Sequence, residues 1–248
     1  MKKWEQLPED MKVPQVRKYY DILQKKRLSL AVKRAFDIVV SAVMLILFSP
    51  VFLILAVAIK KDSVGPVFFR QERVTRYGKH FRIFKFRTMV NNADKLGSQV
   101  TVGNDKRITK VGNIIRKFRL DEICQLIDVF RGTMSFVGTR PEVPKYVEKY
   151  TPEMKATLLL PAGVTSQASI FYKDEDKLLA DTDDVDKTYV EKILPEKMKY
   201  NLKAIKEFSL LGELKLMIMT VLAVAGLEPG KKKTKAKRGA CRRRKADV

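Results

Sequence analysis

The stretch IRKFRLDEICQLIDVFRGTMSFVGTRPE, residues 115–142, combines a helical pattern of apolar residues with paired acids and several arginines. Apolar side chains recur at three- and four-residue spacing and predict one face of a short amphipathic helix: Leu120, Ile123, Cys124, Ile127 and Phe130. Asp121, Gln125 and Asp128 fall on the opposite side. The helix is expected to stop at Gly132, ahead of a turn that presents Arg140.

Two adjacent acids, Asp121 and Glu122, come at the start of this predicted helix. Unpaired backbone N–H groups and the positive end of the helix dipole favour ionised carboxylates there, which makes a nucleophile or a metal ligand available. Acids in a first turn are also common as plain helix caps, so the local pattern leaves both interpretations open. Basic residues on either side, among them Arg116 and Arg140, suit a divalent metal and a phosphorylated substrate.

The charge balance restricts the class of partner. The chain has 50 Lys and Arg against 28 Asp and Glu, a formal net charge of +22. This predicts an anionic partner, which can be nucleic acid, a phospholipid surface or a phosphate-bearing substrate. Two cysteines are too few for a disulfide framework or a thiolate zinc site, and His80 is the only histidine. Carboxylate chemistry is therefore favoured over histidine or thiolate chemistry.

The strongest compositional signal is the uncharged segment 38–59, IVVSAVMLILFSPVFLILAVAI. At about 1.5 Å per helical residue it is long enough to cross a hydrocarbon layer, and it starts too late for a cleaved signal peptide. It predicts a membrane-bound protein. Ser49 and Pro50 in its middle predict a kink, and basic residues flank both ends, which favours the cytoplasmic face for both. Our hypothesis is a re-entrant hairpin that returns at Pro50; the alternative is a straight, kinked span.

Four consecutive regions follow from these patterns. Residues 1–30 form a basic lead-in whose apolar positions from Val16 to Leu30 predict a helix, lying either along an interface or on the surface. Residues 31–61 hold the membrane segment, and residues 62–230 form a cytoplasmic domain. Residues 231–248, with ten Lys and Arg against one Asp, read as a disordered basic tail.

Within residues 62–230 the clearest local signal is a small β-hairpin. Tyr77-Gly78-Lys79 supplies the turn, and after it two sets of side chains alternate: Phe81, Ile83, Lys85 and Arg87 against Arg82, Phe84, Phe86 and Thr88. The hairpin carries several candidate phosphate contacts: Arg70, Arg73, Lys85 and Arg87. Contact with lipid headgroups is the alternative interpretation of these side chains. Further along, residues 91–110 predict a polar loop over a site, the acids of 174–186 a solvated loop and helix cap, and residues 196–208 and 210–227 two helices.

Three blocks of this sequence resemble one family, the bacterial sugar transferases of the monotopic polyprenyl-phosphate phosphoglycosyl transferase type. They are KRAFDIVVSAVMLILFSP at 33–50, GPVFFRQERVTRYGKHFRIFKFRTM at 65–89, and LDEICQLIDVFRGTMSFVGTRPE at 120–142. The resemblance covers roughly residues 31–225, and three ordered blocks are more specific than any single motif. It implies a mostly helical α+β fold: a re-entrant helical membrane hairpin and a small cytoplasmic catalytic domain that contains a short β-hairpin.

The resemblance also implies a reaction. A sugar phosphate would pass from a nucleoside diphosphate sugar, such as a UDP-sugar, to a membrane polyprenyl phosphate such as undecaprenyl phosphate, with release of a nucleoside monophosphate. Asp121 would form a covalent phosphosugar–aspartate, and Glu122 would help to hold Mg²⁺ or accept a proton, so both acids are also the expected metal ligands. Substrate phosphates would be bound by four cations: Lys85, Arg87, Arg116 and Arg140.

The implied setting is the cytoplasmic face of the bacterial inner membrane, at the first membrane step of glycoconjugate or exopolysaccharide synthesis. Assembly into a homo-oligomer stays open, and nucleic acid is not an expected partner. The family usually has proline where this chain has Thr139 and often asparagine at Asp128, differences that bear on specificity more than on the reaction. Two alternatives remain: a basic, membrane-anchored protein that binds nucleic acid or acidic lipid, and an enzyme that uses another phosphodiester donor.

Overall fold

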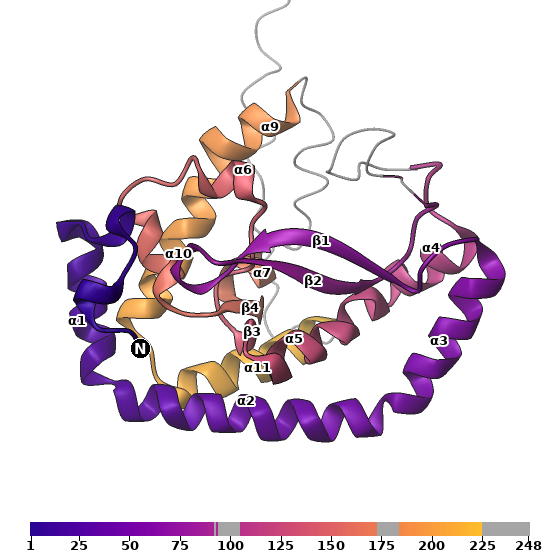
Figure 1. Ribbon diagram of the computed structural model, residues 1–248, viewed down its shortest axis with the longest axis horizontal. Coiled ribbons are helices and arrows are strands. Elements are labelled where there is room, and N and C mark those ends of the chain that lie inside the picture. Colours follow the sequence, from indigo (N-terminus) through magenta and orange to yellow (C-terminus); the bar gives the residue numbers. More distant parts are fainter. Residues whose placement is uncertain (92, 94–104, 173–183, 225–248) are drawn as a thin grey trace, which may run out of the picture.

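The computed structural model describes residues 1–91, 93, 105–172 and 184–224, and this part of the chain is mostly helical with two small sheets (Figure 1). Its longer helices and its strands are α1 (Pro14–Lys25), α2 (Arg27–Leu47), α3 (Ser49–Asp62), β1 (Phe68–Val74), β2 (His80–Phe86), α4 (Lys110–Lys117), α5 (Leu126–Arg131), β3 (Met134–Val137), β4 (Ala162–Thr165), α10 (Leu194–Lys206) and α11 (Leu210–Val224). Short helical turns are η1 (Trp4–Gln6), η2 (Glu9–Met11), η3 (Arg76–Gly78), η5 (Leu120–Gln125), α6 (Pro144–Val147), η6 (Met154–Leu159), α7 (Gln167–Phe171), α9 (Val185–Thr188) and η7 (Tyr189–Ile193).

Helices α2 and α3 form a bent bracket along one side of the molecule (Figure 1). Their axes differ in direction by 59°, and the break falls at Phe48, one residue before Ser49. Pro50 lies in the first turn of α3, where a missing N–H costs no helical hydrogen bond, so the predicted kink is confirmed as a helix boundary. Among the described helices none is long and apolar enough to cross a membrane alone, whereas this bent pair qualifies by length and composition.

A polar stripe on α2 attaches the bracket to the rest of the fold. Asp37 is 3% exposed and accepts from the Ser135 hydroxyl at 2.8 Å, and Lys33 donates to the carbonyl of Val137 at 3.0 Å. Arg34 donates to the carbonyl of Val129 at 2.6 Å, at the C-terminal end of α5, where a cation also complements the helix dipole. Charged residues of α2 therefore bind β3 and α5, and the opposite side of α2 stays exposed.

The predicted β-hairpin is confirmed. Strands β1 and β2 pair antiparallel from Phe68 opposite Phe86 to Val74 opposite His80. Tyr77 and Gly78 both have positive φ values, 61° and 69°, in the connecting turn. In this register Arg73 and Lys85 project from the same face of the hairpin, since their positions are separated by an even number of residue steps across the ladder.

The second sheet consists of β3 and β4, which pair in parallel, and the sequence patterns gave no sign of it. The two segments stay in close backbone contact just after β3: Gly138 donates to the carbonyl of Thr165 at 3.0 Å, and Gly163 donates to that of Thr139 at 2.9 Å. A Cβ on Gly163 would lie 2.1 Å from the amide nitrogen of Gly138, so a side chain is excluded there. This contact fixes the start of the turn at 138–142.

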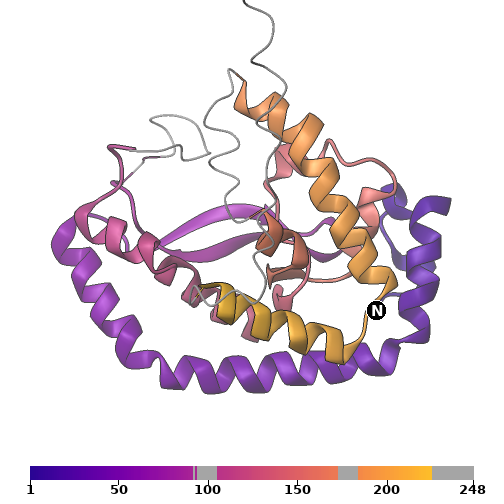
Figure 2. The same ribbon diagram turned by 180° about the vertical axis from the view of Figure 1, so that it is seen from behind.

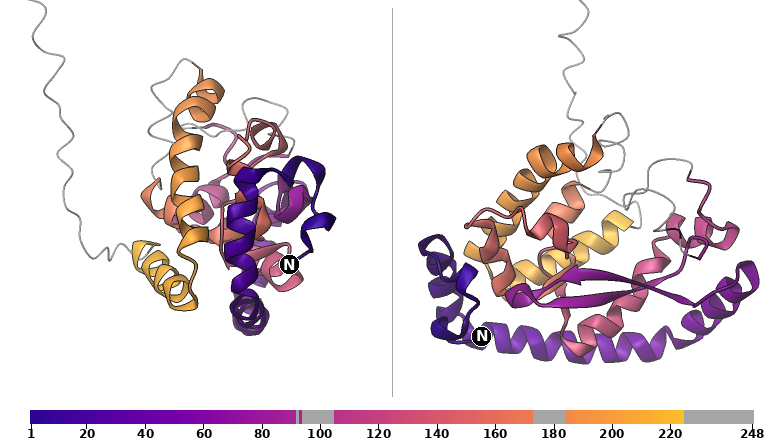
Figure 3. Two further views of the ribbon diagram at one scale, coloured as in Figure 1. Left: turned by 90° about the vertical axis from the view of Figure 1, so that its left-hand side faces the viewer. Right: turned by 45° about the horizontal axis from the view of Figure 1, so that its top comes forward.

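The main hydrophobic core packs the N-terminal helix α1 against α10, which lies far from it in the sequence. Four residues of α1 are buried: Val16, Tyr19, Tyr20 and Leu23. They belong to one cluster with Leu194, Met198 and Ile205 of α10, which lies beside α1 in Figures 2 and 3. The helix predicted from position 16 to 30 is thus divided at Lys26 into α1 and the start of α2, and the protein's own core covers its apolar face.

The remaining expectations have mixed outcomes. Helices α10 and α11 confirm the two predicted near 196–208 and 210–227. Asp184 caps α9 by accepting from the backbone N–H of Lys187 at 2.9 Å, which confirms the helix-cap interpretation at that position. Most of the predicted loop at 91–110, the acids at 174–183 and the basic tail at 231–248 lie outside the described residues.

Candidate active site

The acid pair lies in the short 3₁₀ turn η5, directly after a residue in the left-handed region. Arg119 has φ 54° and ψ 27°, an uncommon conformation for a residue other than glycine. It separates the end of α4 from η5 and so redirects the chain just before Asp121 and Glu122. On the other side of η5, Cys124 packs with Leu55 and Ile59 of α3, which fixes this turn against the bracket.

The predicted single helix over 120–130 is divided into η5 and α5, and this changes which side chains are buried. Gln125 and Asp128, predicted on the polar side, are 1% and 2% exposed, whereas Phe130 is 47% exposed. A 3₁₀ turn has three residues per turn instead of 3.6, so positions after it rotate away from the helical register. Asp128 accepts from the backbone N–H of Phe84 at 2.8 Å, a contact with β2.

Glu122 forms ion pairs with two cations from different parts of the fold. The Arg140 guanidinium contacts both of its oxygens, with Nη1 at 3.4 Å from Oε2, and Lys85 Nζ of β2 lies 3.5 Å from Oε1. Burial alone would raise the pKa of Glu122, but the charges of Arg140 and Lys85 outweigh it and hold the pKa well below its ordinary range. Glu122 is therefore an ionised residue at neutral pH that holds the two cations together.

Asp121 has the opposite environment. No side chain in the described part of the chain hydrogen-bonds its carboxylate, and the thiol of Cys124 contacts only its backbone carbonyl. Burial raises the pKa of Asp121, and the negative charge of Glu122 raises it further, while Lys85 and Arg116 oppose the shift. Two adjacent acids thus have pKa values moved in opposite directions, which is the arrangement expected when one carboxylate is reactive and its neighbour is electrostatic.

The other predicted phosphate contacts do not all join this site. Arg116 of α4 acts on Asp121 through its charge, and Arg73 of β1 acts likewise on Glu122. Arg87, by contrast, is 5% exposed and donates to the carbonyl of Ser63 at 2.6 Å and to that of Val64 at 3.1 Å. Its guanidinium ties the end of α3 to the hairpin, so the structure gives Arg87 a structural position outside the acid pair.

A metal ion was expected at Asp121 and Glu122. Among the described residues no group of three or more His, Cys, Asp or Glu side chains is close enough to form a complete site. Mg²⁺, however, is commonly held by one or two carboxylates together with substrate phosphates. The donor set fits that mode, because the Asp121 carboxylate accepts from no side chain among residues 1–91, 93, 105–172 and 184–224 and stands next to Glu122.

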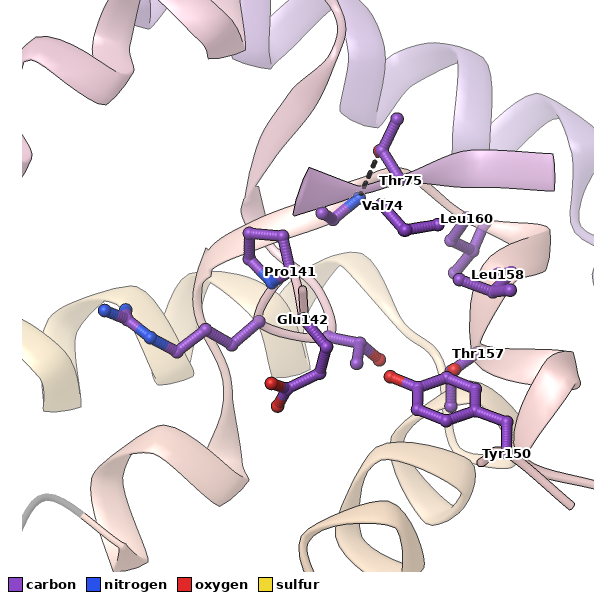
Figure 4. A pocket seen from close by; sticks show the side chains of 11 residues that line it. Val74, Thr75, Pro141, Glu142, Tyr150, Thr157, Leu158 and Leu160 are labelled. Atoms are coloured by element: carbon purple, nitrogen blue, oxygen red, sulfur yellow. Dashed lines mark hydrogen bonds between the residues drawn. The ribbon is translucent and has the colours of Figure 1, made fainter. Parts of the chain in front are cut away.

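The turn that carries Arg140 is supported from behind by a second buried acid. Glu142 is 6% exposed, accepts from the Tyr189 hydroxyl at 2.5 Å and lies 3.5 Å from Lys197 Nζ. Beside the turn is a small pocket whose lining includes Arg140, Pro141, Glu142 and Tyr150. Figure 4 shows the last three among the residues that line it. The turn was predictable from the sequence, but this support was not, because its members come from positions 142, 189 and 197 and share no local pattern.

Comparisons with known proteins agree with this arrangement. The family profile described as bacterial sugar transferase matches residues 28–226. A UDP-N-acetylgalactosamine-undecaprenyl-phosphate N-acetylgalactosaminephosphotransferase of Aeromonas hydrophila is 34% identical over 78% of this chain and 43% of its own length. A UDP-glucose:undecaprenyl-phosphate glucose-1-phosphate transferase of Escherichia coli is 37% identical over 76% and 39%. One of the same description from Caulobacter vibrioides is 34% identical over 76% and 68%. The chain thus spans less than half the length of the first two relatives.

Proposed function

Because this chain belongs to the bacterial sugar transferase family, we propose that it transfers a sugar phosphate from a nucleoside diphosphate sugar to undecaprenyl phosphate. The relatives named above are transferases that act on UDP-sugars and undecaprenyl phosphate. The observation that carries the proposal is the contrast within the acid pair: Glu122 is bound by Arg140 and Lys85, whereas no described side chain hydrogen-bonds Asp121. The reading of the chain as a basic nucleic-acid-binding protein finds no support in these relatives.

The proposed reaction has two displacements at one phosphorus atom. A carboxylate oxygen of Asp121 attacks the phosphorus that bears the sugar, and the phosphoanhydride bond breaks with its electron pair leaving on the nucleoside monophosphate. An oxygen of undecaprenyl phosphate then attacks the same phosphorus and displaces the Asp121 carboxylate. The products are nucleoside monophosphate and a polyprenyl diphosphate sugar. Lys85, Arg116 and Arg140 would neutralise the phosphate oxygens, which is most of what such a reaction needs from a protein.

In this proposal Asp121 and Glu122 would also hold Mg²⁺, which when bound supplies further charge neutralisation at the donor diphosphate. Glu122 would keep Lys85 and Arg140 beside the phosphates in the absence and in the presence of substrate. The raised pKa of Asp121 has a kinetic consequence, since only the ionised carboxylate is a nucleophile. Turnover should therefore fall as the pH is lowered toward that pKa from above.

The lipid substrate and the exposed apolar bracket suggest a location at the inner membrane, with the active site on the cytoplasmic face. The outer side of α2 and α3 carries a set of exposed apolar side chains: Leu28, Val32, Phe36, Ile38, Val39, Val43, Ile46, Leu47, Leu53, Ile54 and Val57. Contiguous apolar surface of this extent marks an interaction site, and a bilayer is the partner that a polyprenyl phosphate requires. We retain the re-entrant hairpin as the proposed membrane topology.

The test is nucleoside monophosphate release by purified protein in nanodiscs with undecaprenyl phosphate, Mg²⁺ and a panel of nucleotide sugars. Wild type should release the monophosphate from at least one donor with transfer of labelled sugar phosphate to lipid. Asp121→Asn should abolish release. Asp128→Asn is the matched control, because an asparagine oxygen can still accept from the Phe84 N–H, and it should retain turnover. Wild type that is folded and inactive with every donor would contradict the proposal.

A further inference from the structure

The segment Arg140-Pro141-Glu142 is fixed on one side by the β-hairpin. The backbone N–H of Val74 in β1 donates to the carbonyl of Glu142 at 3.0 Å. Arg73, also in β1, donates through Nη1 to the carbonyl of Pro141 at 3.1 Å and through Nη2 to the side chain of Gln71 at 2.6 Å. These bonds hold the backbone of the segment next to β1. They do not fix the position of the Glu142 side chain, which has other partners.

The other side is held through the Glu142 side chain. Its Oε1 accepts from the hydroxyl of Tyr189 at 2.5 Å and lies 3.5 Å from Nζ of Lys197, while Lys197 also donates to the Tyr189 hydroxyl at 2.9 Å. The carboxylate and the ammonium group are each 7% exposed. A buried carboxylate that loses its partners is strongly unfavourable, so this contact specifies one position for Glu142.

Glu142 is separated from Arg140 by one proline, whose ring restricts the backbone. The two side chains run to different partners: Arg140 to Glu122 of η5, and Glu142 to residues of η7 and α10. Because the linker is two peptide bonds long, a shift of Glu142 toward or away from α10 must move the Cα of Arg140. The helix α10 is thereby connected to the acid pair although it contributes no side chain to it.

We propose that Glu142, held by Tyr189 and Lys197, is a positioning residue that sets the reach of Arg140 to Glu122 and to the donor phosphate. The proposal rests on the proposed function for its catalytic consequence, but its geometric consequence is independent of any reaction. Misplacing a phosphate-binding guanidinium by about 1 Å can cost up to about 100-fold in rate. Glu142→Gln keeps the size of the side chain and removes the negative charge that Lys197 contacts, so it should loosen this contact and lower turnover by about 10-fold.

A double-mutant cycle with Arg140→Gln separates positioning from a general loss of structure. If Glu142 acts through Arg140, adding Glu142→Gln to Arg140→Gln should lower nucleoside monophosphate release by less than about 2-fold further. Tyr189→Phe serves as a milder variant if Glu142→Gln does not fold, and it should show the same dependence. Glu153→Gln is the matched control, because Glu153 also accepts from a tyrosine, Tyr19 at 2.6 Å, and pairs with a lysine, Lys18 at 2.7 Å, outside the site.

The second measurement does not depend on activity. The guanidinium resonances of Arg140, assigned by comparison with Arg140→Lys in protein labelled at arginine, should shift in Glu142→Gln and stay unchanged in Glu153→Gln. Independent, multiplicative losses in the cycle, or an unchanged Arg140 resonance in Glu142→Gln, would overturn the proposal. If wild type releases nothing from any donor, the proposed function fails, and the Arg140 resonance alone then decides for or against the positioning role.

Discussion

Two kinds of carboxylate in this protein differ in what they contact. Asp37 and Asp128 anchor the fold, and each accepts hydrogen bonds from a backbone N–H and a hydroxyl: Phe136 and Ser135 for Asp37, Phe84 and Thr133 for Asp128. The Asp121 carboxylate, by contrast, accepts no hydrogen bond from another residue in the described part of the chain, and its charged neighbours include Lys85 and Arg116. Structural carboxylates are satisfied within the fold, whereas a reactive one is left for a substrate or a metal. The difference identifies Asp121 better than burial or charge does.

The largest effect should come from removing the unpartnered carboxylate. Asp121→Asn should lower nucleoside monophosphate release by about 10³-fold or more, because an amide is not a nucleophile at phosphorus. Asp128→Asn should change release by less than about 3-fold, because the side chain's hydrogen-bond acceptor for Phe84 is kept. Comparable losses in the two variants would remove the distinction between reactive and anchoring acids.

Substitutions of Arg140 test whether the cations next to the acid pair stabilise the phosphate charges of the donor. Arg140→Gln should lower turnover by about 10²-fold, the range found when one charge-stabilising donor is removed. Arg140→Lys keeps the charge but not the two-pronged contact with both oxygens of Glu122, so a smaller loss of about 10-fold is expected. Equal activity of wild type and both variants in steady-state assays would show that Arg140 does not bind the donor.

For the anchoring carboxylate Asp37, the expected effect is on the free energy of unfolding. Asp37→Ala should destabilise the fold by about 2–4 kcal/mol, because it leaves the Ser135 hydroxyl and the Phe136 N–H without an acceptor in a buried position. Thermal unfolding in nanodiscs measures the change. Asp21→Ala removes an exposed carboxylate paired with Arg17 at 3.0 Å and should cost under about 0.5 kcal/mol. A loss for Asp37→Ala no larger than that of Asp21→Ala would show that Asp37 does not anchor α2.

A smaller effect of opposite sign is expected for the stability of Asp121→Asn. The folded-state pKa of Asp121 is raised above its ordinary value of 3.8, so the unfolded chain loses this proton first and stability falls as the pH rises through that window. Asparagine removes the ionisation, and the variant should gain about 0.5–2 kcal/mol over wild type at neutral pH. The gain should shrink below about pH 4, where Asp121 is protonated in both states. A variant less stable than wild type at pH 7 would contradict the unfavourable burial of this charge.

The contribution of Glu122 to stability should depend on pH in the opposite direction. Its pKa is held below the ordinary value of 4.5 by Arg140 and Lys85, against the effect of burial. Its contribution to stability is therefore fully present above pH 4.5 and is lost as the pH falls toward the folded-state pKa. Comparing the acid unfolding of wild type with that of Glu122→Gln checks this sign, since the variant should lose less stability between neutral pH and pH 3.

Patterns of local origin were predictable from the sequence. The turn at Tyr77-Gly78 and the alternation after it defined the hairpin, and the charged helix expected at 196–208 corresponds to α10. Ser49 and Pro50 marked the boundary between α2 and α3 within one residue, because proline acts on its own backbone. The pair Asp121-Glu122 was found as a candidate, but only the resemblance of three blocks to one family favoured a functional role over a helix cap.

Features that depend on tertiary contact were not predictable. Strand β3 has four residues, all buried, and so shows no alternation that could distinguish it from a loop. Arg87 and Lys85 look equivalent two residues apart, yet Arg87 binds the carbonyls of Ser63 and Val64 while Lys85 reaches Glu122. The support of Arg140 by Glu142 and Lys197 joins positions 55 residues apart, for which no local pattern exists.

The central claim is that Asp121 is the nucleophile, and trapping the intermediate tests it most directly. Protein in nanodiscs without lipid phosphate would be incubated with a donor labelled in the phosphate next to the sugar, quenched in acid, digested and examined by mass spectrometry. The proposed mechanism predicts one sugar phosphate on the peptide that contains Asp121, its loss on adding undecaprenyl phosphate, and its absence in Asp121→Asn. Label on another residue, or rapid turnover with no labelled protein at any time, would contradict it.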